Sequence, residues 1–179
     1  MLSITLQEAL NKQVKHEAAS SQIYLAMASW SDIQPGLQGV TEFFYQQSDE
    51  ERDHMLKLVK YINERGGMAI VPALEQPIIT FPSLKKLFEE FLRNETGVSE
   101  SINDIVHLAL QEKDYATHNF LQWYVAEQIE EERLARTLNE KLELIGDDKS
   151  GLYLFDRDII AYRASLSGRA GGNAQGHRH

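Results

Sequence analysis

The segment VTEFFYQQSDEERDHMLKLVKY, residues 40–61, decides the fold, and it contains neither proline nor glycine. Steps of alternately four and three residues along it select a mainly apolar set that also includes a glutamate and a histidine. The set is Val40, Phe44, Gln47, Glu51, His54, Leu58 and Tyr61. This spacing is typical of one face of an α-helix that packs in the core of a bundle.

Three other segments have similar apolar stripes, and each stripe carries a glutamate near its middle. These glutamates are Glu17, Glu95 and Glu131. The four prolines lie between the stripes rather than within them, so the stripes fall on uninterrupted helices. We predict helices at residues 5–32, 37–65 and 83–145, and we divide the last region near Glu112–Asp114 because it is too long for one helix of a compact domain.

The connections predict how these helices are arranged. Short turns join the first two helices and the last two, which makes each pair antiparallel. The middle connection, residues 66–82, could span about 56 Å when extended, enough to run the length of a bundle. A short fifth helix is predicted from Ser150 to about Leu166. The fold class is therefore all-α: one four-helix bundle domain over residues 1–166 with a long crossover, followed by a Gly-rich tail at 167–179 that we expect to be disordered.

The four interior glutamates are predicted to meet at one height in the bundle. Glu17 and Glu51 are about equally far from the first turn, and Glu95 and Glu131 are about equally far from the second. In antiparallel helices, equal distances from a turn give equal heights along the axis. Four buried carboxylates would repel one another, and two divalent metal ions would neutralise them. Oxygen ligands with one imidazole, His54, suit iron or manganese.

Composition excludes several classes of function. The chain has 179 residues, a formal net charge of −9 and no cysteine. Without cysteine there are no disulfides, iron–sulfur clusters or Cys-ligated zinc. The acidic balance disfavours nucleic acids and anionic membranes as partners. The N-terminus shows neither a signal peptide nor a membrane span, so we expect a cytoplasmic protein.

Two motifs resemble a known family. Residues 50–54, EERDH, resemble the EExxH motif of ferritins, and residues 120–132, FLQWYVAEQIEEE, closely resemble the NFLQWYVxEQxEEE stretch of bacterial non-haem ferritins. The resemblance covers about residues 1–165. It implies a ferritin-like fold and an iron store with ferroxidase activity, in which O2 or H2O2 oxidises Fe2+. It also implies a shell of twenty-four subunits, with the fifth helices meeting around four-fold axes.

The resemblance also implies the roles of individual residues. Glu17, Glu51 and His54 would bind one iron, Glu51 would bridge, and Glu95 and Glu131 would bind the second iron. The resemblance places Gln128, Tyr24 and Trp123 close to this pair of irons. It also implies a third iron site formed by Glu50, Glu127 and Glu130, with Glu131 shared.

The residues themselves leave some of these assignments open. Tyr24 can equally be a core aromatic whose hydroxyl bonds to a carboxylate. For Trp123 we favour packing, because tryptophan is usually buried. Glu50, Glu127 and Glu130 lie beside the apolar stripe, so a partly solvated acidic face remains an alternative to a third metal site.

Several related proteins are disfavoured by specific residues. Bacterioferritins carry a second Glu-x-x-His where this chain has Leu134, and a haem-binding methionine where it has Arg52, so we expect no haem. His16, His107 and His118 lie off the stripes and are expected at the surface.

Two other functions stay open at this point. A di-iron oxidase for a small organic substrate would need a pocket where Tyr24, Leu121 and Tyr124 are expected to fill the space. A helical signalling bundle usually has a secretion signal and often disulfides.

The fifth predicted helix has an apolar set of its own. Its members are Leu152, Phe155, Ile159, Tyr162 and Leu166. A closed four-helix bundle has no interior room for a fifth helix, so we expect this set to be buried against other subunits.

Overall fold

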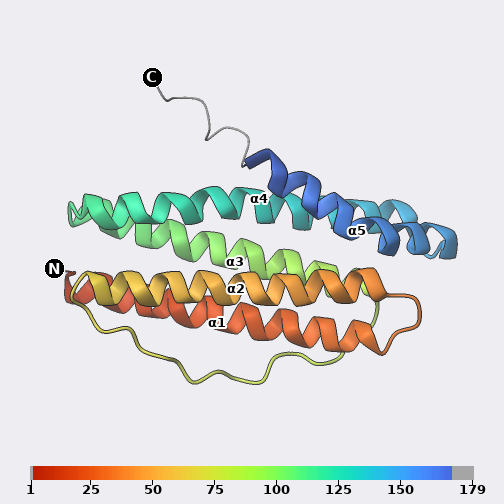
Figure 1. Cartoon of the computed structure of the whole chain (residues 1–179), viewed down its shortest axis with the longest axis horizontal. Helices are drawn as coiled ribbons and strands as arrows, with labels where there is room; N and C mark the ends of the chain where they lie inside the picture. Colours follow the sequence, from red (N-terminus) through yellow and green to blue (C-terminus); the bar gives the residue numbers. More distant parts are fainter. Residues whose placement is uncertain (1, 171–179) are drawn as a thin grey trace.

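The computed structural model describes residues 2–170, and five helices make up most of this part of the chain. The helices are α1 (Ile4–Asp32), α2 (Gln38–Glu64), α3 (Leu84–Gln111), α4 (Tyr115–Ile145) and α5 (Lys149–Ala170). The first four lie side by side along the long axis (Figure 1). The predicted all-α bundle with a fifth C-terminal helix is confirmed. The disordered tail expected at residues 167–179 was placed too early, because α5 continues to Ala170, and residues 171–179 lie outside the described part.

Local signals in the sequence account for the helix ends. Ser83 and Asp114 begin α3 and α4, where their side chains accept hydrogen bonds from the backbone N–H groups of Lys86 and Thr117. Such caps satisfy N–H groups that have no partner within the helix. Gly146 ends α4 with a φ of 58°, a conformation that favours glycine. The division of residues 83–145 near Asp114 is therefore confirmed.

The long connection between α2 and α3 runs along the outside of the bundle. It leaves the end of α2 that lies near the N-terminus and reaches α3 at the opposite end, passing beside α1 (Figure 1). As a result α3 begins at the far end of the bundle, and α1 and α3 lie next to each other. The crossover predicted from its length is confirmed.

The core consists of two apolar clusters separated along the bundle axis. One is rich in phenylalanine and contains Phe43, Phe44, Phe88 and Phe91, together with the C-terminal half of α4. The other contains aliphatic residues from the opposite ends of the same helices, such as Leu10, Leu58 and Ile102. On each of the first four helices, the interior glutamate lies between the residues that contribute to the two clusters. A polar layer therefore crosses the middle of an apolar bundle.

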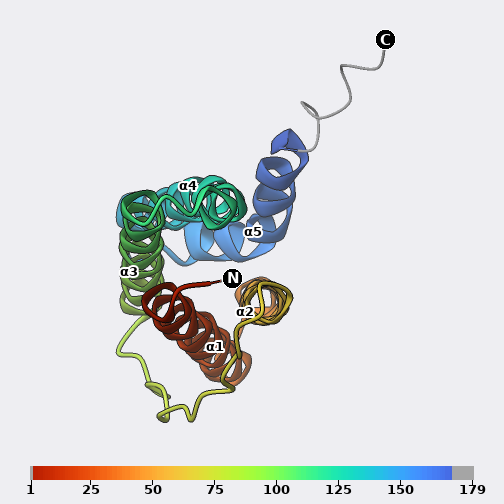
Figure 2. The same ribbon diagram turned by 90° about the vertical axis from the view of Figure 1, so that its left-hand side faces the viewer.

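The packing of α5 differs from the expectation. Phe155 and Ile159 are buried against this chain's own bundle, where the ring of Phe155 meets that of Phe88 edge-on at 5.5 Å. The prediction that other subunits cover these two residues was therefore wrong. In the described residues, α5 contacts both α2 and α4, which make no close backbone contact with each other (Figure 2). α5 therefore packs between the first part of α2 and the last part of α4. Towards the other end of the bundle α2 and α4 meet directly through side chains, with the rings of Tyr61 and Phe120 stacked at 3.7 Å.

Two backbone contacts fix α5 at the start of α2. The N–H of Val40 donates to Asp156 Oδ1 at 2.8 Å, and this carboxylate serves an α2 N-terminus that has no side-chain cap of its own. Gly39 lies so close to the carbonyl oxygen of Asp156 that a Cβ would come within 1.9 Å of it. None of the described helices is both long and apolar enough to cross a membrane.

Candidate metal centre

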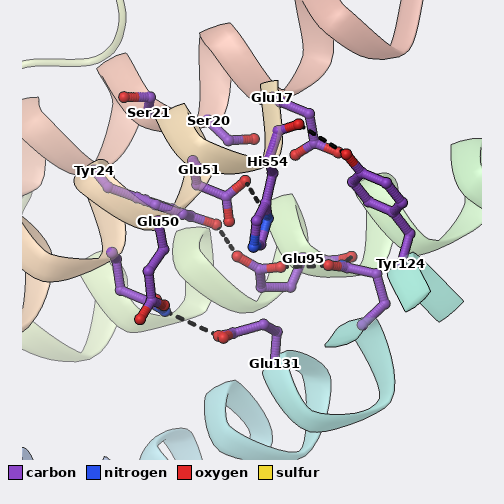
Figure 3. A network of polar contacts seen from close by, with 12 residues as sticks. Glu17, Ser20, Ser21, Tyr24, Glu50, Glu51, His54, Glu95, Tyr124 and Glu131 are labelled. Carbon is purple, nitrogen blue, oxygen red and sulfur yellow. Dashed lines mark hydrogen bonds and ion pairs between the residues drawn. The ribbon is translucent and has the colours of Figure 1, made fainter. Parts of the chain in front are cut away.

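The polar layer brings together side chains from four helices (Figure 3). Glu17 comes from α1, Glu51 and His54 from α2, Glu95 from α3 and Glu131 from α4. The first four are buried, and Glu131 is half-buried. Carboxylates are almost never fully buried without a partner, so this layer requires a specific source of compensation.

The tightest group contains Glu17, Glu51 and His54. One ligand atom from each lies within 4.8 Å of the other two. Among the described residues, the Oε2 atoms of Glu17 and Glu51 are buried without a hydrogen-bond partner. His54 Nδ1 lies 3.6 Å from Glu51 Oε2, too far for a good hydrogen bond. Two unpaired oxygens and an imidazole directed at one point form the donor set that a divalent cation needs.

Glu95 is held in place through both of its carboxylate oxygens. The Tyr24 hydroxyl donates to Oε1, and Gln128 Nε2 donates to Oε2 at 3.1 Å. Tyr24 in turn accepts a hydrogen bond from Asn94 Nδ2 at 2.7 Å. Burial raises the pKa of Glu95 to about 7, although both hydrogen bonds oppose the rise. Tyr24 is therefore a buried aromatic residue whose hydroxyl bonds to a carboxylate of the layer.

Glu131 approaches from the opposite side of the layer. Its Oε2 accepts a hydrogen bond from Gln47 Nε2 at 2.9 Å. Burial and the charge of Glu95 raise its pKa to about 8. Glu95 and Glu131 lie outside the tight group, but both are close enough for their charges to raise the pKa of Glu51. The five side chains therefore share one electrostatic environment.

The four carboxyl groups resist ionisation for a common reason. Burial is the largest cause of the raised pKa of Glu17 and of Glu51, and neighbouring carboxylates add to it. A cation in the layer would remove both costs, since it replaces lost hydration and screens the repulsion. Glu17, Glu51 and His54 therefore fit a divalent metal ion, and Glu95 and Glu131 lie close enough for their charges to act on Glu51.

The acids proposed for a third site lie at the edge of this layer. The carboxylate of Glu50 forms an ion pair with Arg163 of α5. Burial raises the pKa of Glu127, and the charges of Glu130 and Glu50 add to the rise. Glu50 and Glu127 also line a hollow of about 380 Å³ that reaches His54.

Trp123 lies on the wall of the same hollow and not in the core. It is 36% exposed, so the expectation that it is buried by packing was wrong. Its ring meets that of His54 edge-on at 5.2 Å, and Lys57 Nζ lies 3.3 Å from its centroid. Trp123 therefore contacts the His54 imidazole on one side and Lys57 on the other, within the lining of the hollow.

Of the three histidines expected at the surface, His107 is exposed, whereas His16 and His118 are half-buried. None of them belongs to the metal-binding group found among the described residues.

Three residues around the centre were not predicted. Gln13 is buried and donates to Glu17 Oε1 at 2.9 Å, which leaves Oε2 as the unpaired oxygen. Gln47 orients Glu131, and its place on the apolar stripe was an available signal. Arg163 follows Phe155 and Ile159 in steps of four residues, which places it on the same face of α5.

Comparisons with known proteins agree with this geometry. The family model of the ferritin-like domain matches residues 7–145. A probable bacterial non-heme ferritin-like protein of Haemophilus influenzae is 42% identical over 159 residues, 89% of this chain and 96% of that protein. A bacterial non-heme ferritin of Staphylococcus aureus is 41% identical over 161 residues, 90% of this chain and 96% of that protein. Crystal structures of an open pore ferritin from Archaeoglobus fulgidus match with a TM-score of 0.86 at 42% identity, covering 89% of this chain and 98% of that one.

Proposed function

The chain belongs to the ferritin family, and we propose that it is a non-haem ferritin that oxidises Fe2+ at the layer of buried carboxylates and stores the product as a ferric mineral. The observation that carries this proposal is the pair of buried oxygens, Glu17 Oε2 and Glu51 Oε2, which lack partners beside His54. A structural role alone would leave these oxygens desolvated at a cost of about 1–3 kcal/mol each. Binding of a cation between these oxygens would offset this cost.

In this proposal each side chain has a defined role toward the iron substrate. Glu17 and His54 hold one Fe2+, Glu95 and Glu131 hold the other, and Glu51 is shared by both. Binding displaces the protons that the raised pKa values favour. Each Fe2+ then loses one electron, and the two electrons together with two protons reduce O2 to H2O2, or reduce H2O2 to two molecules of water. Carboxylates are hard ligands that favour the ferric product.

Supporting residues keep this geometry ready for iron. Gln13 holds one oxygen of Glu17, and Tyr24 and Gln128 hold both oxygens of Glu95. Because these groups are already oriented, little reorganisation is needed when a cation enters. Gln128 and Tyr24 therefore act by positioning Glu95 in the proposed site.

We assign the next step to the acids at the edge of the layer. Glu50, Glu127 and Glu130, with Glu131 shared, form a third iron position that passes ferric iron on towards the mineral in the cavity of the shell. The mutual influence of these charges and the hollow that reaches His54 support this assignment.

The shell of twenty-four subunits belongs to the same proposal. Large apolar side chains such as Val71, Leu144 and Tyr153 are 86%, 89% and 66% exposed in the single chain. Contacts with other subunits would cover such surfaces. Gel filtration of the intact protein should give a mass of several hundred kDa.

A double substitution tests the proposed oxidation site. Glu51→Ala with His54→Ala should abolish rapid Fe2+ oxidation, followed as the rise in ferric absorbance after aerobic addition of Fe2+, while the shell remains assembled. Glu100→Ala with His107→Ala is a matched control, because it removes the same two residue types from exposed positions on α3. An assembled Glu51 and His54 variant that oxidises iron as fast as this control would refute the site.

The alternative, a di-iron oxidase of a small organic substrate, has less support. Tyr24, Leu121 and Tyr124 are fully or almost fully buried and fill the space beside the proposed metal positions. The hollow on the other side is lined by charged groups, including Asp53 and Lys57, which suits ions better than an apolar substrate.

A further inference from the structure

Arg163 is a buried cation that α5 brings to the edge of the metal centre. Its residue is 7% exposed, and its guanidinium pairs with the carboxylate of Glu50. The same group donates to Gln46 Oε1 at 2.8 Å and to Gln47 Oε1 at 3.2 Å. All three acceptors are on α2, more than 110 positions away in the sequence. The guanidinium of Arg163 is therefore held in a defined position beside α2.

The way α5 docks explains why the guanidinium lies in this place. Asp156 binds the backbone of Val40, and Phe155 and Ile159 are buried against the bundle. These contacts are on the same side of α5 as Arg163, one or two turns before it. The cation is thus tethered to the bundle, and its concentration near Glu50 is high whether or not metal is present.

The partner of Arg163 has a second proposed role. Glu50 directly precedes Glu51 in the sequence, and it lines the hollow that Glu127 and His54 also line. Its side chain is 47% exposed, so ions from solvent can reach it. A guanidinium and a metal ion cannot both occupy the same carboxylate oxygens without strong repulsion between the two cations.

We infer that Arg163 is a tethered counter-cation, which occupies Glu50 in the metal-free protein and is displaced when a metal ion binds at the third position. The inference depends on the proposed function, because it takes Glu50 as a ligand of that position. Arg163 then has two effects. It neutralises one acid while the site is empty, and it weakens metal binding there, so that the buried pair of positions fills first.

Calorimetric titration of the metal-free protein with Zn2+, which is redox-inert, tests the inference without reference to activity. The Zn2+ ion that depends on Glu50 is the binding event that Glu50→Gln loses. Arg163→Gln should strengthen that event about tenfold, the size of effect expected for one charge-assisted hydrogen bond. Arg157→Gln is the matched control, because Arg157 is on the same helix but pairs with its neighbour Asp158 at 2.6 Å.

The outcomes separate this inference from the proposed function. If Glu50→Gln binds as many Zn2+ ions as the unaltered protein, the third position itself is wrong. If Glu50→Gln loses one ion but Arg163→Gln behaves like Arg157→Gln, or binds that ion more weakly, Arg163 is not a competitor. The third position and the competition by Arg163 are both supported only if Glu50→Gln loses one Zn2+ ion and Arg163→Gln binds that same ion more tightly.

A second measurement uses the unaltered protein, because Arg163→Gln could also loosen α5. Amide hydrogen exchange around Arg163 should become several-fold faster when Zn2+ is added, since the guanidinium loses its ion pair with Glu50. In Glu50→Gln the same amides should exchange fast with or without Zn2+. Exchange near Arg163 that Zn2+ leaves unchanged in the unaltered protein would overturn the inference.

Discussion

Replacing Glu17 by glutamine should make the metal-free protein more stable, although it removes a metal ligand. In the structure Glu17 Oε1 accepts from Gln13, while Glu17 Oε2 and Glu51 Oε2 have no partner. A glutamine keeps the acceptor for Gln13 and directs an N–H2 group toward Glu51. Two unpaired oxygens and one like-charge repulsion are thereby removed.

The expected gain follows from the cost of unsatisfied buried groups. Each such group costs about 1–3 kcal/mol, so we expect Glu17→Gln to raise the free energy of unfolding by about 2 kcal/mol at pH 8. For a chain of this size, that corresponds to an increase in melting temperature of about 4–8 °C. The comparison requires one protein concentration and one heating rate, because the protein is expected to be oligomeric.

The gain should depend on pH in a defined direction. Burial raises the pKa of Glu17, and it raises that of Glu95 to about 7 and that of Glu131 to about 8. The folded state therefore holds protons that the unfolded state has released, and stability falls as the pH rises through these values. The metal-free protein should be less stable at pH 8 than at pH 5, and Glu17→Gln should have a smaller effect at pH 5.

Scanning calorimetry of chelator-treated protein at both pH values measures these effects. Glu8→Gln, an exposed substitution on the same helix, is the control. Zn2+ should stabilise the unaltered protein at pH 8, by about 2.7 kcal/mol at one hundred times its dissociation constant, and Glu17→Gln should lose most of this effect. A variant that is less stable than Glu8→Gln at pH 8 would refute the reasoning that unpaired charge dominates this layer.

Two other substitutions test the supports of the site. Tyr24→Phe removes the hydroxyl that donates to Glu95 and should lower the free energy of unfolding by about 1–3 kcal/mol. Because this hydrogen bond lowers the pKa of Glu95, its loss should raise that pKa and weaken Zn2+ binding at pH 7. A calorimetric titration that matches the unaltered protein would contradict this. Gly39→Ala would place a Cβ 1.9 Å from the carbonyl oxygen of Asp156 and should displace α5, lowering stability by about 1–3 kcal/mol in denaturant unfolding. Gly97→Ala meets nothing within 4 Å and should raise stability by about 0.5–1 kcal/mol, so equal effects of the two glycine substitutions would show that α5 does not pack as described.

The course of the bundle could be predicted because its signals are local. Apolar spacing determines which face of each helix is buried, and capping residues such as Ser83 and Asp114 determine where helices begin. The convergence of Glu17, Glu51, Glu95 and Glu131 follows from constant rise per residue in antiparallel helices. The depth of each side chain is less predictable, as the half-burial of Glu131 shows.

The residues that were missed depend on contacts between distant parts of the chain. The contacts of Arg163 form only when α5 packs against both α2 and α4, and apolar residues on several sides of α5 do not indicate which side docks. The exposure of Trp123 has the same origin, because it depends on the hollow between α2 and α4. Gln13 was detectable in principle, since it lies one helical turn before Glu17.

The most direct test of the central claim is anomalous diffraction at the iron edge from crystals soaked with Fe2+ without oxygen. We expect two peaks in the polar layer, one contacted by Glu17 and His54 and the other by Glu95 and Glu131, with Glu51 between them. Iron peaks found only on exposed acidic residues, with none beside His54, would contradict the account.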